Sequence, residues 1–229
     1  PSINLISEDQ INHIKKHDSF GINKSFLFDG LVPTFHMHNW EAGRFKRYEK
    51  IFAPFRDNYE GVISLVHTKY SHRLIHPRMT YTLFPKGIIR ICKFKIPKPI
   101  IIKDNRLYFN ENDFKESLSY RGTLSLGLHI VFHELGYKNI VLLGVDLDTN
   151  NHFYDDYDIL KNNEYYGKDK RKKHYEELFG TKSDGYEFES MYPKTGKPIP
   201  MDEYYYSVAD FLKRKNNVKL FIGFSDNFL

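Results

Sequence analysis

Asp146 and Asp148 stand one residue apart, directly after the apolar run that begins at Asn139. Paired carboxylates beyond a buried strand suit a hard cation such as Mg²⁺ or Mn²⁺, which can bridge them to a diphosphate and stabilise its departure. The alternative is that Asp146 accepts hydrogen bonds from loop amides while Asp148 stays solvated. The spacing therefore predicts a site role for Asp146 and leaves metal binding open.

The residues before these aspartates indicate how the chain positions them. Apolar side chains recur at helical spacing from Leu124 to Leu135, and Gly136 can take the left-handed conformation that ends a helix. The apolar run from Asn139 is continuous, which favours a buried parallel strand. Helix, turn and buried strand form half of a doubly wound α/β unit.

Other segments extend this pattern. Ser7 and Gln10 have the spacing of a capping box and predict a helix through His17. A last helix is predicted over residues 205–215. The predicted strands cover residues 18–23, 61–67, 88–94, 99–102 and 218–222.

These elements predict one α/β domain over residues 1–229, with a doubly wound, mostly parallel, Rossmann-like sheet. Residues 150–200 are polar, aromatic and turn-rich, which indicates a lid-like insertion. Ligands of open α/β sheets sit beyond the carboxyl ends of the strands. The polar side chains at three such ends are Asn23, Asp146 with Asp148, and Ser225 with Asn227.

The composition indicates which partners and which cellular compartment fit the protein. The net charge is +5, and the positive charge gathers at residues 93–103 and 168–173. Such clusters attract phosphates or an anionic membrane face, or they form a solvated basic loop. Cys92 is the only cysteine, so an intrachain disulfide is excluded and a reducing compartment fits. No apolar run approaches the roughly 20 residues of a membrane helix, and we expect a cytoplasmic protein.

Two groups of histidines have informative spacing. His36 and His38 alternate, so they share one face of a strand, and with Asn39 they are candidates for contact with a substrate. His129 and His133 are four residues apart on a helix, which is the spacing of paired metal ligands. Because Glu134 follows this pair and no third ligand is evident, we interpret the pair as structural or surface histidines.

The run from Arg121 to Asp146 resembles a segment of the bacterial sialyltransferases of glycosyltransferase family 42. In that family an Arg-x-Thr opens a helix, a Leu-Gly-Tyr-Lys turn follows, and a strand ends in Gly-Ile-Asp. The counterparts here are Arg121-Gly-Thr123, Leu135-Gly-Tyr-Lys138 and Gly144-Val-Asp146. Weaker matches flank this run in the family's order at residues 1–2, 18–23 and 224–227. Related domains occur in Maf-type flagellin glycosyltransferases and surface-polysaccharide enzymes.

The resemblance implies a GT-A-like glycosyltransferase domain whose first strand and Gly-rich loop lie upstream of Pro1. It implies transfer of sialic acid, Kdo or a related acid sugar from a CMP-activated donor, with inversion and without a required metal. The acceptor would be an oligosaccharide or glycolipid of lipopolysaccharide or capsule. A peripheral contact with the inner membrane is compatible with the basic charge, and no nucleic-acid partner is expected.

The resemblance also assigns roles to residues. Asn23 would contact the nucleotide and Ser2 its phosphate, while Arg121 and Thr123 would line the donor site. Tyr154 matches a tyrosine that hydrogen-bonds the leaving phosphate, a task that a phenol can perform without a metal.

Ser225 and Asn227 lie where the family has a loop near the base and ribose. Two positions depart from the family. Asp148 replaces a second tyrosine, and a carboxylate there would repel a phosphate unless a cation intervenes. The family's general-base histidine has no counterpart before the last helix. The candidates for a replacement base are Asp202, Glu203, His174 and His152.

Two other functions stay open. A metal-dependent transferase could hold a UDP- or GDP-sugar through Asp146 and Asp148, as the Asp-x-Asp of many GT-A glycosyltransferases does. A noncatalytic module that binds nucleotides or nucleic acid is compatible with the basic clusters and tyrosines. These residues are not interleaved as in a known RNA-binding motif, however, which places this alternative last.

Overall fold

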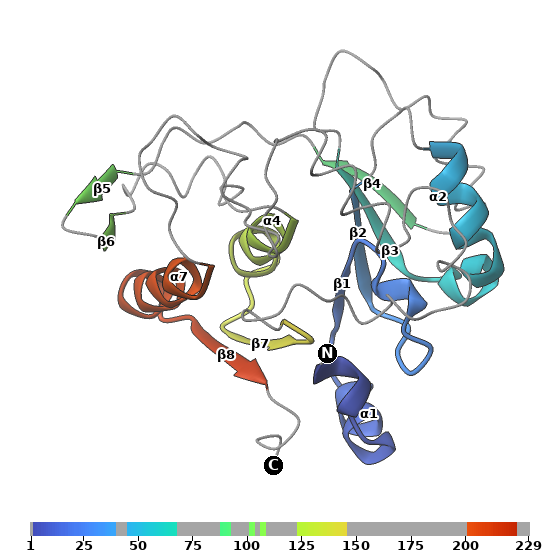
Figure 1. Cartoon of the computed structure of the whole chain (residues 1–229), viewed down its shortest axis with the longest axis horizontal. Helices are drawn as coiled ribbons and strands as arrows, with labels where there is room; N and C mark the ends of the chain where they lie inside the picture. The colour runs from blue at the N-terminus through green and yellow to red at the C-terminus, as the bar shows by residue number, and fades with distance from the viewer. Residues whose placement is uncertain are drawn as a thin grey trace, which may run out of the picture. The chain divides into compact units, whose positions relative to one another are not determined.

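The computed structural model describes seven segments of the chain, which fall into two compact units (Figure 1). The first, which we call the four-stranded unit, comprises residues 7–100 and 109–137. The second, which we call the β7–β8 unit, comprises residues 1–6, 101–108 and 138–229. The single domain predicted over residues 1–229 stays a prediction. The described residues are 2–39, 45–67, 88–92, 101–103, 106–108, 123–145 and 201–223.

The four-stranded unit contains a parallel sheet whose strands follow one another in the order β1-β2-β3-β4. Three of its strands confirm predictions from the sequence, those at 18–23, 61–67 and 88–94, with somewhat shorter bounds. Parallel neighbours need crossover connections, and short helices supply them between β1 and β2 and between β2 and β3. The strands are β1 (Phe20–Ile22), β2 (Phe35–Asn39), β3 (Ile63–His67) and β4 (Ile88–Cys92).

One face of this sheet carries polar rings under an aromatic layer. His36 and His38 lie on it, since alternate residues of β2 point to the same face. The rings that contact these two histidines come from the crossover helices η2 (Ser25–Leu27), α2 (Phe45–Phe52) and η4 (Ala53–Tyr59). They are Phe26, Tyr48, Phe52 and Tyr59.

The opposite face is apolar and packs against α4 (Thr123–His129). Met37 and Leu65, which are paired across β2 and β3, form a core cluster with Leu126 and Ile130. Helices thus cover both faces of the sheet, as a parallel sheet requires. The strand order runs in one direction within the described residues, so the doubly wound arrangement stays a prediction.

The C-terminal end of α4 differs from an ordinary helix. It continues into one π-helical turn, η7 (Ile130–Glu134), in which the Leu135 N–H donates to the Ile130 carbonyl at 2.9 Å. Gly136 then stops the helix in the left-handed region, at φ +76°, which confirms the predicted end. The helical periodicity of the sequence did not predict the π turn.

The N-terminal helix of the same unit, α1 (Glu8–Ile14), begins at the predicted capping box. The Gln10 N–H donates to Ser7 Oγ at 3.3 Å, and the Ser7 N–H donates to Gln10 Oε1 at 2.8 Å. The helix ends three residues earlier than predicted. The chain continues to His17 in tighter turns, where the His17 N–H donates to the Ile14 carbonyl at 2.9 Å.

The β7–β8 unit is built on a parallel pair of strands and one long helix. The predicted strand after Gly136 is confirmed as parallel, but it is not buried on both faces. Ile140 and Leu142 are buried, whereas Val141 and its partner Phe221 are 45% and 50% exposed. The elements are η1 (Ser2–Leu5), β5 (Ile101–Lys103), β6 (Arg106–Tyr108), β7 (Asn139–Leu143), α7 (Met201–Asn216) and β8 (Lys219–Gly223).

The helix α7 begins four residues before the predicted start and leads into β8. Val208 and Leu212 are completely buried, and the Val218 N–H donates to the Leu212 carbonyl at 3.1 Å as the chain turns into the strand. None of the helices in the described segments is both long and apolar enough to cross a membrane.

We expect Gly21→Ala to destabilise the four-stranded unit. A Cβ at Gly21 would lie 2.6 Å from Ser25 Oγ and 3.2 Å from His36 Nδ1, closer than van der Waals contact allows. Overpacking of this kind costs roughly 1–3 kcal/mol, measurable as a lower urea midpoint with an unchanged m-value. Adding Ser25→Ala removes the closest clashing atom and should restore part of the loss. Equal losses in the single and double variants would contradict the steric explanation.

Candidate functional site

Asn23 stands at the carboxyl end of β1, where parallel α/β sheets bind their ligands. Its φ is 51°, in the left-handed region that asparagine tolerates better than most residues. Its N–H donates to the Met37 carbonyl at 3.0 Å, so the chain turns only after the pairing with β2 is complete. The residue as a whole is half-buried.

The carbonyl group of Asn23 is held by the polar face of the sheet. His36 Nε2 lies 2.9 Å from this oxygen, and the Tyr48 hydroxyl lies 3.5 Å from it. Because a carbonyl can only accept, Nε2 of His36 must carry the proton. Both main-chain polar groups of Asn23 are therefore bonded, and the residue is fixed in place.

The tautomer of His36 follows from its second nitrogen. Burial lowers the pKa of His36 to about 4, against the smaller opposing effect of the Asn23 carbonyl, so the ring is neutral at pH 7. With Nε2 protonated, Nδ1 accepts a hydrogen bond from the Tyr59 hydroxyl at 2.6 Å. Burial also raises the pKa of Tyr59, which keeps this phenol protonated as the donor.

His38 extends the same network. Its ring stacks on that of His36, with centroids 4.0 Å apart and planes 7° from parallel, and its Nδ1 is hydrogen-bonded to the Tyr48 hydroxyl. Burial and the neighbouring His36 lower the pKa of His38 well below its usual value. The predicted common face of the two histidines is confirmed.

The role predicted for His38 needs correction in one respect. Its side chain is 0% exposed, so it has no surface with which to touch a substrate, and it holds Tyr48 instead. Tyr48 and Tyr59 were missed from the sequence because their partners lie 10 and 23 residues away, on another element. Two neutral, fully buried imidazoles do not exchange protons with a substrate. Their contribution is to fix the main chain at Asn23.

Within this arrangement, the side-chain amide of Asn23 takes no part in the hydrogen bonds described above. An amide presents one acceptor and two donors, which suits the edge of a base or the oxygens of a ribose or phosphate. Since the backbone on both sides is hydrogen-bonded, little conformational freedom remains to be lost when a ligand binds.

The other predicted site residues are distributed as follows. Thr123 is the half-buried first residue of α4, and Asn39 is the last residue of β2, both in the unit of Asn23. In the β7–β8 unit, Ser2 begins η1, while Asp202 and Glu203 lie in the first turn of α7. The predicted site residues outside the described segments are Arg121, Asp146, Asp148, His152, Tyr154, His174, Ser225 and Asn227.

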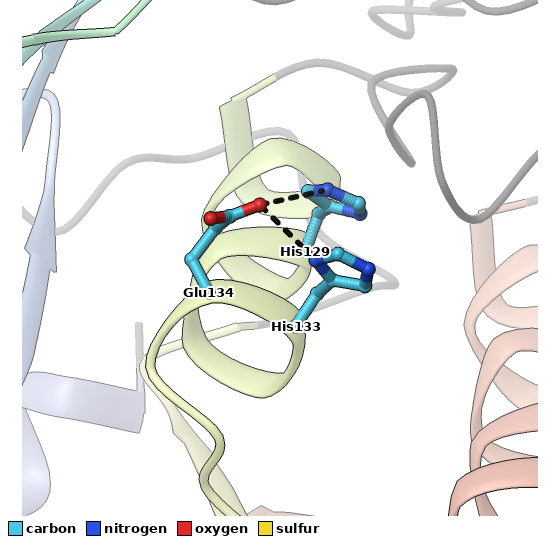
Figure 2. A group of neighbouring side chains, drawn as sticks. All are labelled: His129, His133 and Glu134. Atoms are coloured by element: carbon cyan, nitrogen blue, oxygen red, sulfur yellow. Dashed lines mark hydrogen bonds and ion pairs between the residues drawn. The ribbon is translucent and has the colours of Figure 1, made fainter.

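A second polar group lies at the end of α4 (Figure 2). The rings of His129 and His133 stack with centroids 4.9 Å apart, and Glu134 points its carboxylate toward them. His133 Nδ1 is 3.1 Å from Glu134 Oε1, and His129 Nε2 is 4.0 Å from the same oxygen. Among the described segments this is the one group of three such side chains whose geometry could hold a metal ion. The sequence missed Glu134 as its third member.

Comparisons with known proteins identify no relative of this chain. No protein-family model matches the chain, and neither the search of curated proteins nor that of solved structures found a match.

We expect the free energy of unfolding to fall as the pH is lowered from about 6.5 to about 4. The unfolded chain binds protons on histidines that the folded chain keeps neutral, so stability is complete above pH 6.5 and lost below it. The shift of the pKa of His36 from 6.5 to about 4 corresponds to at most about 3 kcal/mol. Urea unfolding at several pH values measures this dependence.

His36→Gln should make this pH dependence shallower, because glutamine can still donate to the Asn23 carbonyl but does not titrate. His13→Gln replaces an exposed histidine of α1 and serves as the control. If both variants kept the slope of the unmodified chain, the buried ring would not be its source.

Proposed function

We propose that this chain is a glycosyltransferase domain that takes a nucleotide-activated sugar, with a CMP-activated acid sugar as the favoured donor. The observation that carries the proposal is the placement of Asn23 at the carboxyl end of β1, with its main chain held by His36 and its side-chain amide outside these bonds. This is the edge at which open α/β sheets bind nucleotides.

The resemblance to family 42 supports the same assignment from the sequence. Asn23 falls where that family has a nucleotide-contacting asparagine. The helix, glycine turn and strand that the resemblance assigns to residues 123–146 correspond to α4, Gly136 and β7. Thr123, the residue assigned to the donor site, is the first residue of that helix.

The proposed fold is a doubly wound sheet, and the position of α4 supports it. The crossover helices η2, α2 and η4 all contact the face of His36, whereas α4 packs on the face of Met37. Crossovers between parallel strands are right-handed, so helices on opposite faces belong to strands added in opposite directions. A helix on the second face is what a change of winding direction requires.

The proposed reaction is a displacement at the anomeric carbon. An acceptor hydroxyl forms the new carbon–oxygen bond, the bond between that carbon and the phosphate oxygen breaks, and CMP leaves with inversion. The hydroxyl proton passes to a general base. His36 and His38 are excluded from this task because they are completely buried. The proposed candidates for the base remain Asp202, Glu203, His152 and His174.

The proposed acceptor is an oligosaccharide or glycolipid of a bacterial surface glycan, with the reaction on the cytoplasmic side of the inner membrane. A net charge of +5 supports a peripheral contact with anionic lipid and attraction of an acidic donor. Neither Mg²⁺ nor Mn²⁺ is required in this proposal, because Tyr154 would stabilise the leaving phosphate. No nucleic-acid partner is proposed.

We expect Asn23→Gly to weaken CMP binding roughly 3- to 10-fold, the effect of one lost hydrogen bond. Glycine adopts a positive φ without strain, so the variant keeps the backbone and its carbonyl while it loses the amide. Asn217→Gly is the matched control, because Asn217 is exposed and also has a φ of 51°. Calorimetric titration with CMP in the presence of EDTA measures both variants.

The same titration with UDP and GDP separates the alternatives. Binding of UDP or GDP that needs Mn²⁺ and is lost in Asp148→Ala would replace the proposed donor with a metal-bound one. Binding of RNA that weakens steeply with salt would favour a nucleic-acid module. Equal CMP affinities for the unmodified chain and Asn23→Gly would contradict the role of Asn23.

A further inference from the structure

The end of α4 and the π-helical turn that follows it bring three polar side chains to one side of the helix. We propose that His129, His133 and Glu134 form a binding site for a divalent transition-metal ion of the Zn²⁺ class. This proposal uses other residues than Asp146 and Asp148, and it does not depend on the proposed glycosyltransferase function.

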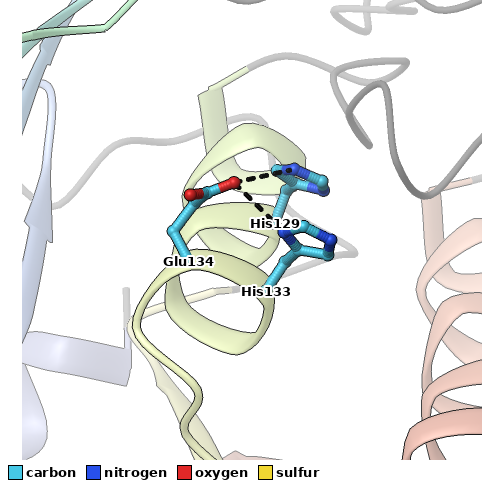
Figure 3. A network of polar contacts seen from close by, with 3 residues as sticks. All are labelled: His129, His133 and Glu134. Carbon is cyan, nitrogen blue, oxygen red and sulfur yellow. Dashed lines mark hydrogen bonds and ion pairs between the residues drawn. The ribbon is translucent and has the colours of Figure 1, made fainter.

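The helix geometry explains why Glu134 belongs to the group. In an α-helix, five residues advance by about 500°, which would leave Glu134 about 140° around the axis from His129. A π turn closes its hydrogen bond between residues five apart, as the Leu135 N–H does with the Ile130 carbonyl. The wider turn lets residue 134 come back toward the side of His129, and Figure 3 shows its carboxylate directed at both rings.

The distances fit a metal ion after small adjustments. The three ligand atoms all lie within 4.8 Å of one another, and Glu134 Oε1 is 3.1 Å from His133 Nδ1 and 4.0 Å from His129 Nε2. Bonds of 2.0–2.1 Å to tetrahedral Zn²⁺ place its ligand atoms about 3.3 Å apart. The His133–Glu134 contact already has this separation. The His129 nitrogen would have to approach Glu134 Oε1 by roughly 0.7 Å and the His133 nitrogen by up to about 1.5 Å.

The chemistry of the three groups selects the class of ion. Metals bind the neutral form of an imidazole ring and the ionised form of a carboxyl group. Two imidazoles and one carboxylate suit Zn²⁺ and its neighbours, whereas Mg²⁺ and Ca²⁺ prefer oxygen ligands alone. Three protein ligands leave a fourth position for water or a substrate oxygen.

Burial on one side and exposure on the other give the site both rigidity and access. The side chain of His129 is 3% exposed, so it is held by the surrounding protein. The side chains of His133 and Glu134 are 42% and 57% exposed, so an ion can reach them from solvent. The exposed positions of these two residues also mean that their replacement leaves the core intact.

The test is a titration of the full chain, freed of metal by EDTA and desalting, with ZnCl₂ in competition with a chromophoric chelator. We expect one tight Zn²⁺ site. Its affinity should fall at least roughly tenfold in His133→Ala and in Glu134→Gln, since replacing even a residue that hydrogen-bonds to a metal ligand lowers the affinity by this amount. His13→Ala is the matched control. His13 and His17 are also four apart and exposed, with centroids 5.1 Å apart, and should bind weakly without a carboxylate.

Two further readouts separate this site from other histidines of the chain. Co²⁺ should give visible ligand-field absorption that decreases in Glu134→Gln but not in His13→Ala. Glu134→Gln should keep the CMP affinity of the unmodified chain, so failure here is distinguishable from failure of the proposed function. Zn²⁺ affinities of His133→Ala and Glu134→Gln that equal that of the unmodified chain, or no stoichiometric binding by that chain, would overturn the proposal.

Discussion

The hydrogen bond from His36 Nε2 to the Asn23 carbonyl is the interaction on which this part of the molecule depends. The carbonyl follows the last residue of β1, where the chain has turned into the left-handed region. A buried carbonyl without a donor costs about 1–3 kcal/mol, and the imidazole supplies that donor from the next strand. The tautomer of the ring and the donor role of the Tyr59 hydroxyl follow from this one bond, whereas burial keeps the ring neutral against it.

The two faces of the same sheet have different tasks. On the face of Met37, apolar side chains pack against α4 and provide the stabilisation expected of a core. On the face of His36, the two imidazoles lie among aromatic rings. Each hydrogen bond between an imidazole and a tyrosine hydroxyl restricts the positions of both side chains. The first face anchors α4, whose last residue is His129 and whose π turn carries Glu134. The second determines the conformation of Asn23.

Local features of the fold were predictable from the sequence because short-range interactions produce them. The capping box at Ser7 and the glycine stop at Gly136 involve residues within a few positions of each other. The π turn was not predictable in this way, since the apolar residues from Leu124 to Leu135 also fit the spacing of an ordinary α-helix. Glu134 consequently looked displaced from the histidine pair, although the wider turn brings its carboxylate to them.

Features that depend on residues far apart in the chain could not be predicted from the sequence for a different reason. A continuous apolar run such as 140–143 does not indicate which face of the strand another layer covers, and Val141 is in fact 45% exposed. In the same way, the alternation of His36 and His38 predicted their common face but not the tyrosines that satisfy them. Those tyrosines come from crossover helices, whose positions depend on the sheet as a whole.

The register of β1 and β2 explains why a histidine can serve the end of the neighbouring strand. His36 is paired with Gly21, two residues before Asn23. Because Gly21 has no side chain, the ring can lie against β1 and reach forward to the Asn23 carbonyl; a Cβ there would lie 3.2 Å from its Nδ1. Since the main chain of Asn23 is held from His36 and Met37, its own side chain has no part in these bonds. The fold therefore fixes the position of the amide without using the amide in its own hydrogen bonds. A ligand-binding residue needs this combination of a fixed position and a side chain that is not already engaged.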